Sequence, residues 1–394
     1  MTRHKSNTSV QKAKTLSAQD IYELTMKTLQ THFTLDMENS RRYQAQDIWD
    51  VVIAASVERM TVETSCDSLE DAPSPNTVRT AVQGVLPDDE HITDLEDQLN
   101  KMLVAHLPKK LLCQSLPCAI DLTSIPYHGQ HPDDDEHIRR GQAKSGTTHF
   151  HCYATLCTVK NNKRYTLALS LVRQSDKAHD ILQRLLKRTD HLDVCINRLY
   201  LDREFDNNGV VDCLKKKPFP TIIPLVIRGK KGGTRSLLKG RKSYVTSYSR
   251  SSTTYGSETF TVHVVCKYSK GRYKRHGLYR FAYLVIGELT LTPQQVYEEY
   301  RHRFGIETSY RLMNQTRART TSRSPVLRLF YVGTALLMLN LWSYVKWSYL
   351  FVSRPGPRQV RHRLLPLTRW RLWLWEVIKQ RLGFSIEIIV PVPA

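Results

Sequence analysis

The stretch PCAIDLTSIPYHG, residues 117–129, is the point in this 394-residue chain where the sequence pattern changes and the fold is decided. Upstream of it, apolar residues recur at helical spacing, whereas this stretch and those after it are short β-branched or apolar runs separated by polar turns. Its apolar half leads into Asp121 and then at once into a polar turn. We therefore predict a strand here, with a carboxylate where the strand meets the turn.

The runs that follow specify an order of elements. We expect strands at residues 149–160, 164–173, 196–202 and 220–228, and helices at residues 178–189 and 207–217. Read from residue 117, the order is three strands, helix, strand, helix, strand, which is the order of the ribonuclease H-like α/β fold. The predicted fold class is thus α/β, with a ribonuclease H-like mixed sheet and flanking helices.

Composition shifts divide the chain further. Residues 1–16 are polar and basic and read as a disordered arm, and residues 229–279 are rich in Gly, Ser, Lys and Arg but keep strand-like alternation, which favours a β-rich lobe. We expect four parts: the arm at 1–16, an all-α N-terminal domain at 17–110, a catalytic domain at 111–350 with a basic β-rich insertion at about 229–279, and a basic C-terminal helical extension at 351–394.

The N-terminal domain admits two interpretations. Residues 68–83 read as a turn followed by a helix with Pro75 near its first turn, which is the shape of a helix-turn-helix. Such a unit would recognise a DNA end. The alternative is a helical scaffold or dimerisation domain, which the six basic against seventeen acidic residues of 16–104 favour.

Charge indicates the kind of partner. The chain carries a formal net charge of +21 and has a sequence pI near 9.7. Residues 214–280 hold seventeen Lys or Arg against one acid, and residues 301–394 hold sixteen against three. A charge balance of this kind is typical of proteins that bind phosphate-rich partners, nucleic acid first and an anionic membrane surface second.

Three other features narrow the class of protein. The uncharged run at 329–345 contains Asn340 and Ser343 and is expected to be a buried core helix, with no membrane span. The eight cysteines form no CxxC pair, so we expect reduced structural thiols. The first twenty residues lack a signal peptide's apolar core, so we expect a cytoplasmic, nucleoid-associated protein.

Three carboxylates are candidates for metal-dependent chemistry. Asp121 and Asp202 each end a predicted core strand, where a buried acid is costly unless it is paired or metal-bound. Glu307 lies in YEEYRHRFGIETSYRLMNQ, residues 297–315, on a helical stripe with Tyr300, Arg303, Arg311 and Asn314. The alternative for Glu307 is a surface ladder with Arg303 and Arg311, four residues to either side.

The three blocks DLTSIPYHG, LDREF and YRHRFGIETSYRLMN resemble those of insertion-sequence DDE transposases whose last block carries a Y-x2-R-x3-E-x6-K signature. The matching positions are Tyr300, Arg303 and Glu307, and Asn314 stands where the family has Lys. The resemblance implies that Asp121, Asp202 and Glu307 are catalytic and bind two Mg²⁺ or Mn²⁺ ions. It also implies that Tyr300 and Arg303 contact the DNA end, with Arg311 or Arg317 supplying the positive charge that Asn314 lacks.

The expected function is therefore a transposase that cleaves and joins the ends of a mobile DNA element. Its partners would be double-stranded DNA and, because two ends must be joined, a second copy of the chain. The alternatives are a ribonuclease H-like nuclease without joining activity, or a non-catalytic DNA-binding regulator. Further DNA contacts are expected from basic residues of the insertion: Lys230, Lys231, Arg241, Lys242, Lys274 and Arg275.

Overall fold

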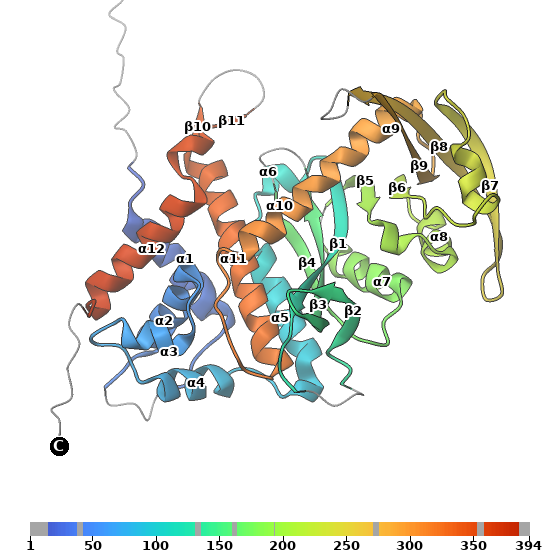
Figure 1. Cartoon of the computed structure of the whole chain (residues 1–394). Helices are drawn as coiled ribbons and strands as arrows, with labels where there is room; N and C mark the ends of the chain where they lie inside the picture. Colours follow the sequence, from blue (N-terminus) through green and yellow to red (C-terminus); the bar gives the residue numbers. More distant parts are fainter. Residues whose placement is uncertain are drawn as a thin grey trace, which may run out of the picture.

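A single mixed β-sheet runs through the molecule, with helices on both of its faces (Figure 1). The computed structural model describes residues 15–37, 42–130, 135–159, 164–192, 194–270, 276–352 and 358–385. In these residues the main sheet has nine strands: β1 (Leu116–Pro126), β2 (Arg139–Lys144), β3 (Thr147–Thr158), β4 (Thr166–Val172), β5 (Ile196–Leu201), β6 (Thr221–Pro224), β7 (Tyr244–Ser252), β8 (Gly256–Lys270) and β9 (His276–Ile286).

The order of the sheet is β2-β3-β1-β5-β6-β9-β8-β7, and β4 also pairs with β3. Strands β1, β5 and β6 are parallel to one another, whereas β3 is antiparallel to both β1 and β4. The helices α7 (Ala178–Thr189) and α8 (Asn208–Lys215) lie between β4 and β5 and between β5 and β6 in the chain. The order of elements predicted from the sequence is confirmed, with the hairpin strand β2 added between the first two.

The insertion forms β-strands, as expected, and these strands join the central sheet. Strands β7, β8 and β9 pair in series, and β9 then pairs antiparallel with β6, so the insertion continues the central sheet. The edge of β6 that β9 occupies would otherwise leave backbone donors and acceptors unpaired. The β-branched alternation of the sequence was therefore correct about strands, but the pairing partner is a core strand.

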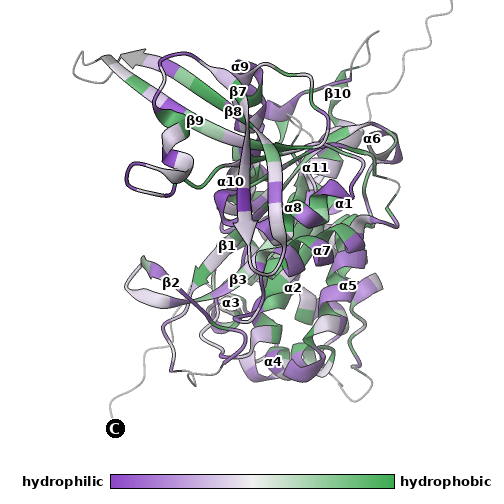
Figure 2. Ribbon diagram, turned by 90° about the vertical axis from the view of Figure 1, so that its right-hand side faces the viewer, coloured by the Kyte–Doolittle hydropathy of each residue, from purple (hydrophilic) through white to green (hydrophobic). Residues whose placement is uncertain are grey.

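The two faces of the sheet bury different helices. Leu116, Cys118 and Ile120 of β1 share a core with α7 and α8, and Ala119 faces the opposite way. Because side chains alternate along a strand, Asp121 lies on the face of Ala119. That face is covered by α9 (Pro293–Tyr300) and α10 (Phe304–Met313). In Figure 2 the hydrophobic residues concentrate along the strands and helices that meet at the centre of the molecule.

A helical region packs against one end of the sheet (Figure 1). Its members come from both ends of the chain: α1 (Ala18–His32), α2 (Ala45–Glu58), α3 (Val62–Asp67), α4 (Pro75–Gly84), α5 (Ile92–Val104), α6 (Lys109–Leu112), α11 (Pro325–Tyr349) and α12 (Leu367–Leu382). Short strands β10 (Phe351–Val352) and β11 (Gln359–Val360) lie between the last two. The turn and helix predicted at residues 68–83 form, with Pro75 at the start of α4, and α3, which was not predicted, precedes them. DNA binding and dimerisation both stay predictions for this region.

The N-terminal helices and α12 share one hydrophobic core. Asp50 of α2 is fully buried and accepts a hydrogen bond from the Tyr22 hydroxyl at 2.7 Å. It also forms an ion pair with Arg381 of α12, whose Nε lies 2.9 Å from the Asp50 carboxylate. The residues assigned to an N-terminal domain and to a C-terminal extension thus fold against each other. Of the sequence's expected disordered arm, residues 1–14 lie outside the described residues.

Helix α11 is buried in the molecule, as expected of a core helix. In the described part of the chain it is the one helix long and apolar enough to cross a membrane. Its Asn340 binds the edge of β4: the side-chain amide donates to Thr166 O at 2.8 Å and accepts from Thr166 N at 2.9 Å. Asn100 of α5 makes the same pair of bonds with Leu169. The two asparagines therefore bond backbone groups on the outer edge of β4, which would otherwise be unpaired.

Candidate active site

Two aspartates lie side by side where the parallel pairing of β1 and β5 ends. Ile120 pairs with Leu201 in the ladder; Asp121 is the next residue of β1, and Asp202 is the first residue after β5. The Asp121 side chain is buried, and its Oδ1 accepts a hydrogen bond from Leu122 N at 2.9 Å. The sequence predicted a turn directly after Asp121, but β1 continues to Pro126 because residues 121–126 pair with β3. The parallel ladder brings together two positions that are 81 residues apart in the sequence.

The segment that carries Glu307 is not one continuous helix. Thr292 caps α9 in front of Pro293, the helix ends at Tyr300, and a 3-10 turn at Arg301–Arg303 leads into α10. A 3-10 turn advances about 120° per residue instead of about 100°, so its three residues turn Tyr300 by about 60° relative to Glu307. Tyr300 and Arg303 are buried, whereas Glu307, Arg311 and Asn314 are exposed.

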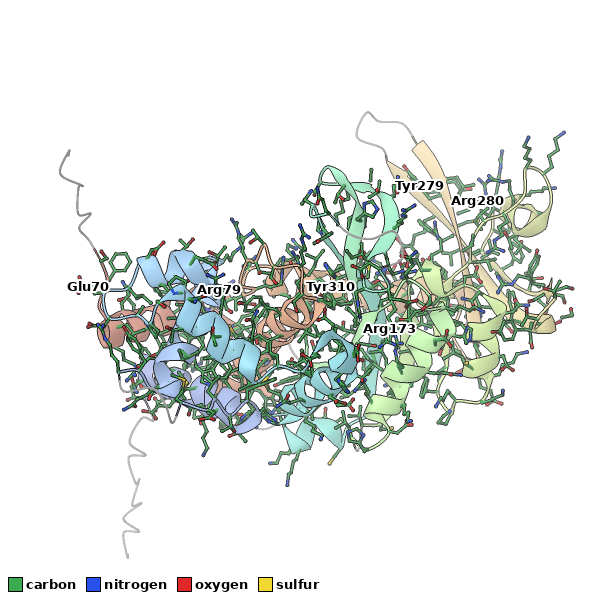
Figure 3. The ribbon with its side chains drawn as sticks, turned by 90° about the horizontal axis from the view of Figure 1, so that it is seen from below. Glu70, Arg79, Arg173, Tyr279, Arg280 and Tyr310 are labelled. Atoms are coloured by element: carbon green, nitrogen blue, oxygen red, sulfur yellow. The ribbon has the colours of Figure 1, made fainter. Side chains whose placement is uncertain are left out.

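Two tyrosines fix α9 and α10 to the strands that carry the aspartates. The Tyr300 hydroxyl donates to Leu201 O at 3.1 Å, one residue before Asp202. The Tyr310 hydroxyl donates to the backbone oxygen of Asp121 at 2.6 Å. Figure 3 shows Tyr310 near the middle of the molecule, between the helical region and the far end of the sheet. The helix segment that holds Glu307 is therefore tied at both ends to the two strands.

Arg303 lies among the three acids. Its Nη2 is 2.8 Å from Asp202 Oδ1, and its Nη1 is 2.9 Å from Glu307 Oε1 and 3.5 Å from Asp121 Oδ2. Only 6% of Arg303 is exposed. The salt-bridge alternative for Glu307 is thus correct for Arg303, but the same guanidinium joins Glu307 to both aspartates, so the three acids converge on one point.

The electrostatics of this point are those of crowded carboxylates. Burial raises the pKa of Asp121 to about 7; Asp202 and Glu307 add to that rise, whereas Arg303 opposes it. Burial lowers the pKa of Arg303, but the neighbouring acids outweigh burial and raise it above its ordinary value. Within the described residues, no group of three His, Cys, Asp or Glu side chains is gathered tightly enough to hold a metal ion, because the acids contact Arg303 instead.

Two hollows meet at these acids, and Asp202, Glu204 and Glu307 line both. The first, of about 590 Å³, also reaches Asp121. The second, of about 740 Å³, includes Arg203, Arg280 and Arg303, and five aromatic residues also line it: Phe281, Tyr283, Tyr297, Tyr300 and Phe304. The acids therefore lie at the boundary between the two hollows.

The other residues predicted to contact DNA lie in different parts of the structure. Arg311 and Asn314 line the first hollow. Arg317 is half-buried beside Tyr153 and Arg328, and burial lowers its pKa. Lys230, Lys231, Arg241 and Lys242 are exposed but are not among the described residues that line either hollow, and Lys274 and Arg275 lie outside the described residues. Their DNA contacts stay predictions.

Sequence reasoning missed the basic hairpin strand opposite Arg311. Arg139, Arg140 and Lys144 of β2 line the first hollow across from α10. Their only signal in the sequence is a cluster of cations at 139–144 directly after an acidic turn, which no motif includes. Asp206, four residues after Asp202, has a fully buried side chain that pairs with Arg250 at 2.7 Å, so its carboxylate stabilises the fold.

Comparisons with known proteins found a matching family model and a similar solved structure. A family model described as "Transposase DDE domain" matches residues 114–341. Among solved structures, the chain is similar to the piggyBac transposase in a synaptic complex with hairpin DNA, with a TM-score of 0.53 and 13% identity over 94% of this chain and 82% of that chain. At that identity the likeness shows the fold. None of the curated proteins searched matches the sequence significantly.

Proposed function

The chain belongs to the family of transposases with a DDE domain, and from this premise we propose that it cuts the ends of a mobile DNA element and joins them to a target. One observation carries the proposal. Asp121, Asp202 and Glu307 come from three separate elements and converge on one guanidinium, at the boundary of two open hollows. A scaffold function would not require three acids at such a place.

The donor set fits hard divalent cations. Mg²⁺ and Mn²⁺ prefer carboxylate oxygens. Asp121 lies within β1, Asp202 directly follows β5, and Glu307 lies on a helix segment that hydrogen bonds hold to both strands. Asp121, Asp202 and Glu307 would hold two such ions. When bound, the ions supply activation of water or a 3′-hydroxyl for in-line attack and stabilisation of the leaving 3′-oxygen.

The chain's own residues position the DNA. Arg139, Arg140 and Lys144 on one wall of the first hollow and Arg311 on the other can bind phosphates on both sides of a strand. Asn314, where the family has Lys, can donate a hydrogen bond to a phosphate but carries no charge. The cations of β2 therefore supply, on the opposite wall of the first hollow, the positive charge that is absent at Asn314 of α10.

Joining requires two DNA ends, so we propose that the chain acts as a dimer or larger assembly on DNA. The similar piggyBac structure is a synaptic complex with hairpin DNA, which supports this arrangement by likeness of fold. We also propose that the protein works in the cytoplasm, at the nucleoid.

The test is incubation of the purified chain with Mg²⁺, a labelled element end and a target plasmid. Cleavage and joined product are expected from the wild type, and neither from Asp202→Ala. The matched control is Asp212→Ala, which removes a half-buried aspartate of α8 that pairs with Lys216 one turn away, and it should retain both activities. Cleavage without joining would favour the nuclease alternative, and equal activity of Asp202→Ala and wild type would refute the carboxylate site.

A further inference from the structure

We propose that Arg303 is a built-in counter-cation of the three carboxylates and competes with divalent metal ions for the same oxygens, so that the DNA-free chain binds metal weakly. The inference rests on the proposed metal site. It assigns Arg303 a positioning role in the metal-free state, in addition to the DNA contact that the sequence resemblance implies.

The contacts of Arg303 are directed at the acids and at little else. Its two terminal nitrogens bind Asp202, Glu307 and, at 3.5 Å, Asp121. Its Nε is buried and has no hydrogen-bond partner among the described residues. A buried donor without a partner is costly. The contacts with the three acids must outweigh that cost, so the acids hold the Arg303 side chain in this position.

The carboxylate oxygens show where Arg303 and a metal ion compete. Asp121 Oδ1 accepts the backbone N–H of Leu122, and its Oδ2 faces Arg303. Because Oδ1 already uses one lone pair, Oδ2 has the greater capacity for a cation, and it is the oxygen that faces the guanidinium. Asp202 and Glu307 likewise direct one oxygen each at Arg303.

Charge repulsion adds to this competition. Metal ions and carboxylate oxygens approach to about 2.0–2.1 Å for Mg²⁺, so an ion shared by these acids would lie within a few ångströms of the guanidinium. Two cations that close repel strongly where water is excluded. Arg303 must then withdraw, and the short 3-10 turn that carries it lies next to the second hollow, which Arg303 also lines.

A phosphate in that hollow gives the displaced guanidinium a new partner. Arginine binds phosphate with parallel hydrogen bonds much as it binds carboxylate. DNA that enters the second hollow would therefore draw Arg303 away from the acids and strengthen metal binding. Metal loading would be coupled to DNA binding through one side chain.

The experiment measures Mn²⁺ binding to the full chain without DNA, by electron paramagnetic resonance and calorimetry. Arg303→Gln is expected to bind Mn²⁺ at least about tenfold more tightly than the wild type. The reason is that a positive charge at this distance changes the affinity of a carboxylate for a proton by about ten- to a thousandfold, and it acts in the same direction on a metal ion. The control Arg301→Gln removes the same charge two residues away, where the side chain is exposed and pairs with Glu298. Equal gains in both variants would reduce the effect to net charge and refute the competition.

A third variant separates this inference from the proposed function. If Asp202→Asn binds Mn²⁺ as tightly as the wild type, the metal site itself is wrong. If Asp202→Asn loses binding and Arg303→Gln gains none, the metal site stands and the competition fails.

Thermal unfolding keeps the test decisive if Arg303→Gln is unstable. Loss of the counter-cation should lower its melting temperature, and Mn²⁺ should raise that temperature more than it raises that of the wild type. A variant that is destabilised and not restored by Mn²⁺ would show that Arg303 serves folding alone, which overturns the proposal.

Discussion

Removal of the Tyr310 hydroxyl tests how the helix that carries Glu307 is held. The hydroxyl is buried, donates to Asp121 O at 2.6 Å, and lies 2.8 Å from the Thr155 hydroxyl. Tyr310→Phe keeps the ring and its apolar contacts, so the loss is confined to two hydrogen bonds. Each contributes about 1 kcal/mol, and Thr155 keeps a contact with Cys157 Sγ at 3.4 Å, so we expect the free energy of unfolding to fall by about 2 kcal/mol.

The assay is denaturation in guanidinium chloride, with Tyr279→Phe as the matched control. Tyr279 lies on β9, half of it is exposed, and Figure 3 shows it at the end of the molecule opposite the helical region. Its variant should change stability by less than about 0.5 kcal/mol. A double-mutant cycle with Thr155→Val should give a coupling energy of about 1 kcal/mol.

The same variant should cleave DNA at least about tenfold more slowly while folded, because a small displacement of Glu307 relative to the aspartates is costly for a site that acts by positioning. A stability loss indistinguishable from that of Tyr279→Phe would refute the hydrogen-bond account. Unchanged cleavage in a destabilised variant would show that the two tyrosine contacts do not position Glu307.

Other outcomes follow from particular buried groups. Asn340→Leu should lower the free energy of unfolding by about 3 kcal/mol, since it leaves the edge of β4 unpaired, whereas the exposed Asn76→Leu should be near neutral; equal losses in chemical denaturation would contradict this. Folded Asp121 has a pKa of about 7 against an ordinary 3.8, so the folded chain holds a proton that the unfolded chain loses between those values. Without metal, the stability of the wild type relative to Asp121→Asn should therefore fall as pH rises from 5 to 7, by up to about 1.4 kcal/mol per pH unit, and then level off; parallel pH profiles would count against it. Arg381→Met should cost about 3–5 kcal/mol because it leaves Asp50 buried without its cation, and Asp50→Asn in the same chain should recover much of that; a loss below about 1 kcal/mol on thermal unfolding would mean that α12 is not tied to α2 through this pair.

The central strands of the fold could be predicted because their signals are local. Strand and helix patterns from residue 117 to residue 228 depend on residues a few positions apart, and the structure confirms their order. Asp121 and Asp202 were found in the same way, since each acid directly follows an apolar run of residues, although β1 continues beyond Asp121 to Pro126. The pairing of β9 with β6 could not be predicted from the sequence, because the residue pattern of a strand does not show which strand it pairs with.

Asn340 shows the same limit within one residue. In the sequence it is a polar residue in an apolar helix, which argued against a membrane span but gave no function. The structure shows that it bonds the backbone of Thr166, a strand residue 174 positions away. The stabilising effect of Asn340 depends on an unpaired strand edge that exists only after the sheet has formed.

The sequence by itself determined the strands, the two aspartates, the helical character around Glu307, and the excess of positive charge. Only the tertiary structure decided that Tyr300 anchors a helix, that Arg303 lies among the acids, and that β2 supplies the opposite basic wall of the first hollow. The physical reason is that the partners of these side chains lie on other elements: the hydroxyls of Tyr300 and Tyr310 bond strands nearly a hundred residues or more away in the sequence. Local pattern specifies which groups are present, and long-range packing specifies which of them meet.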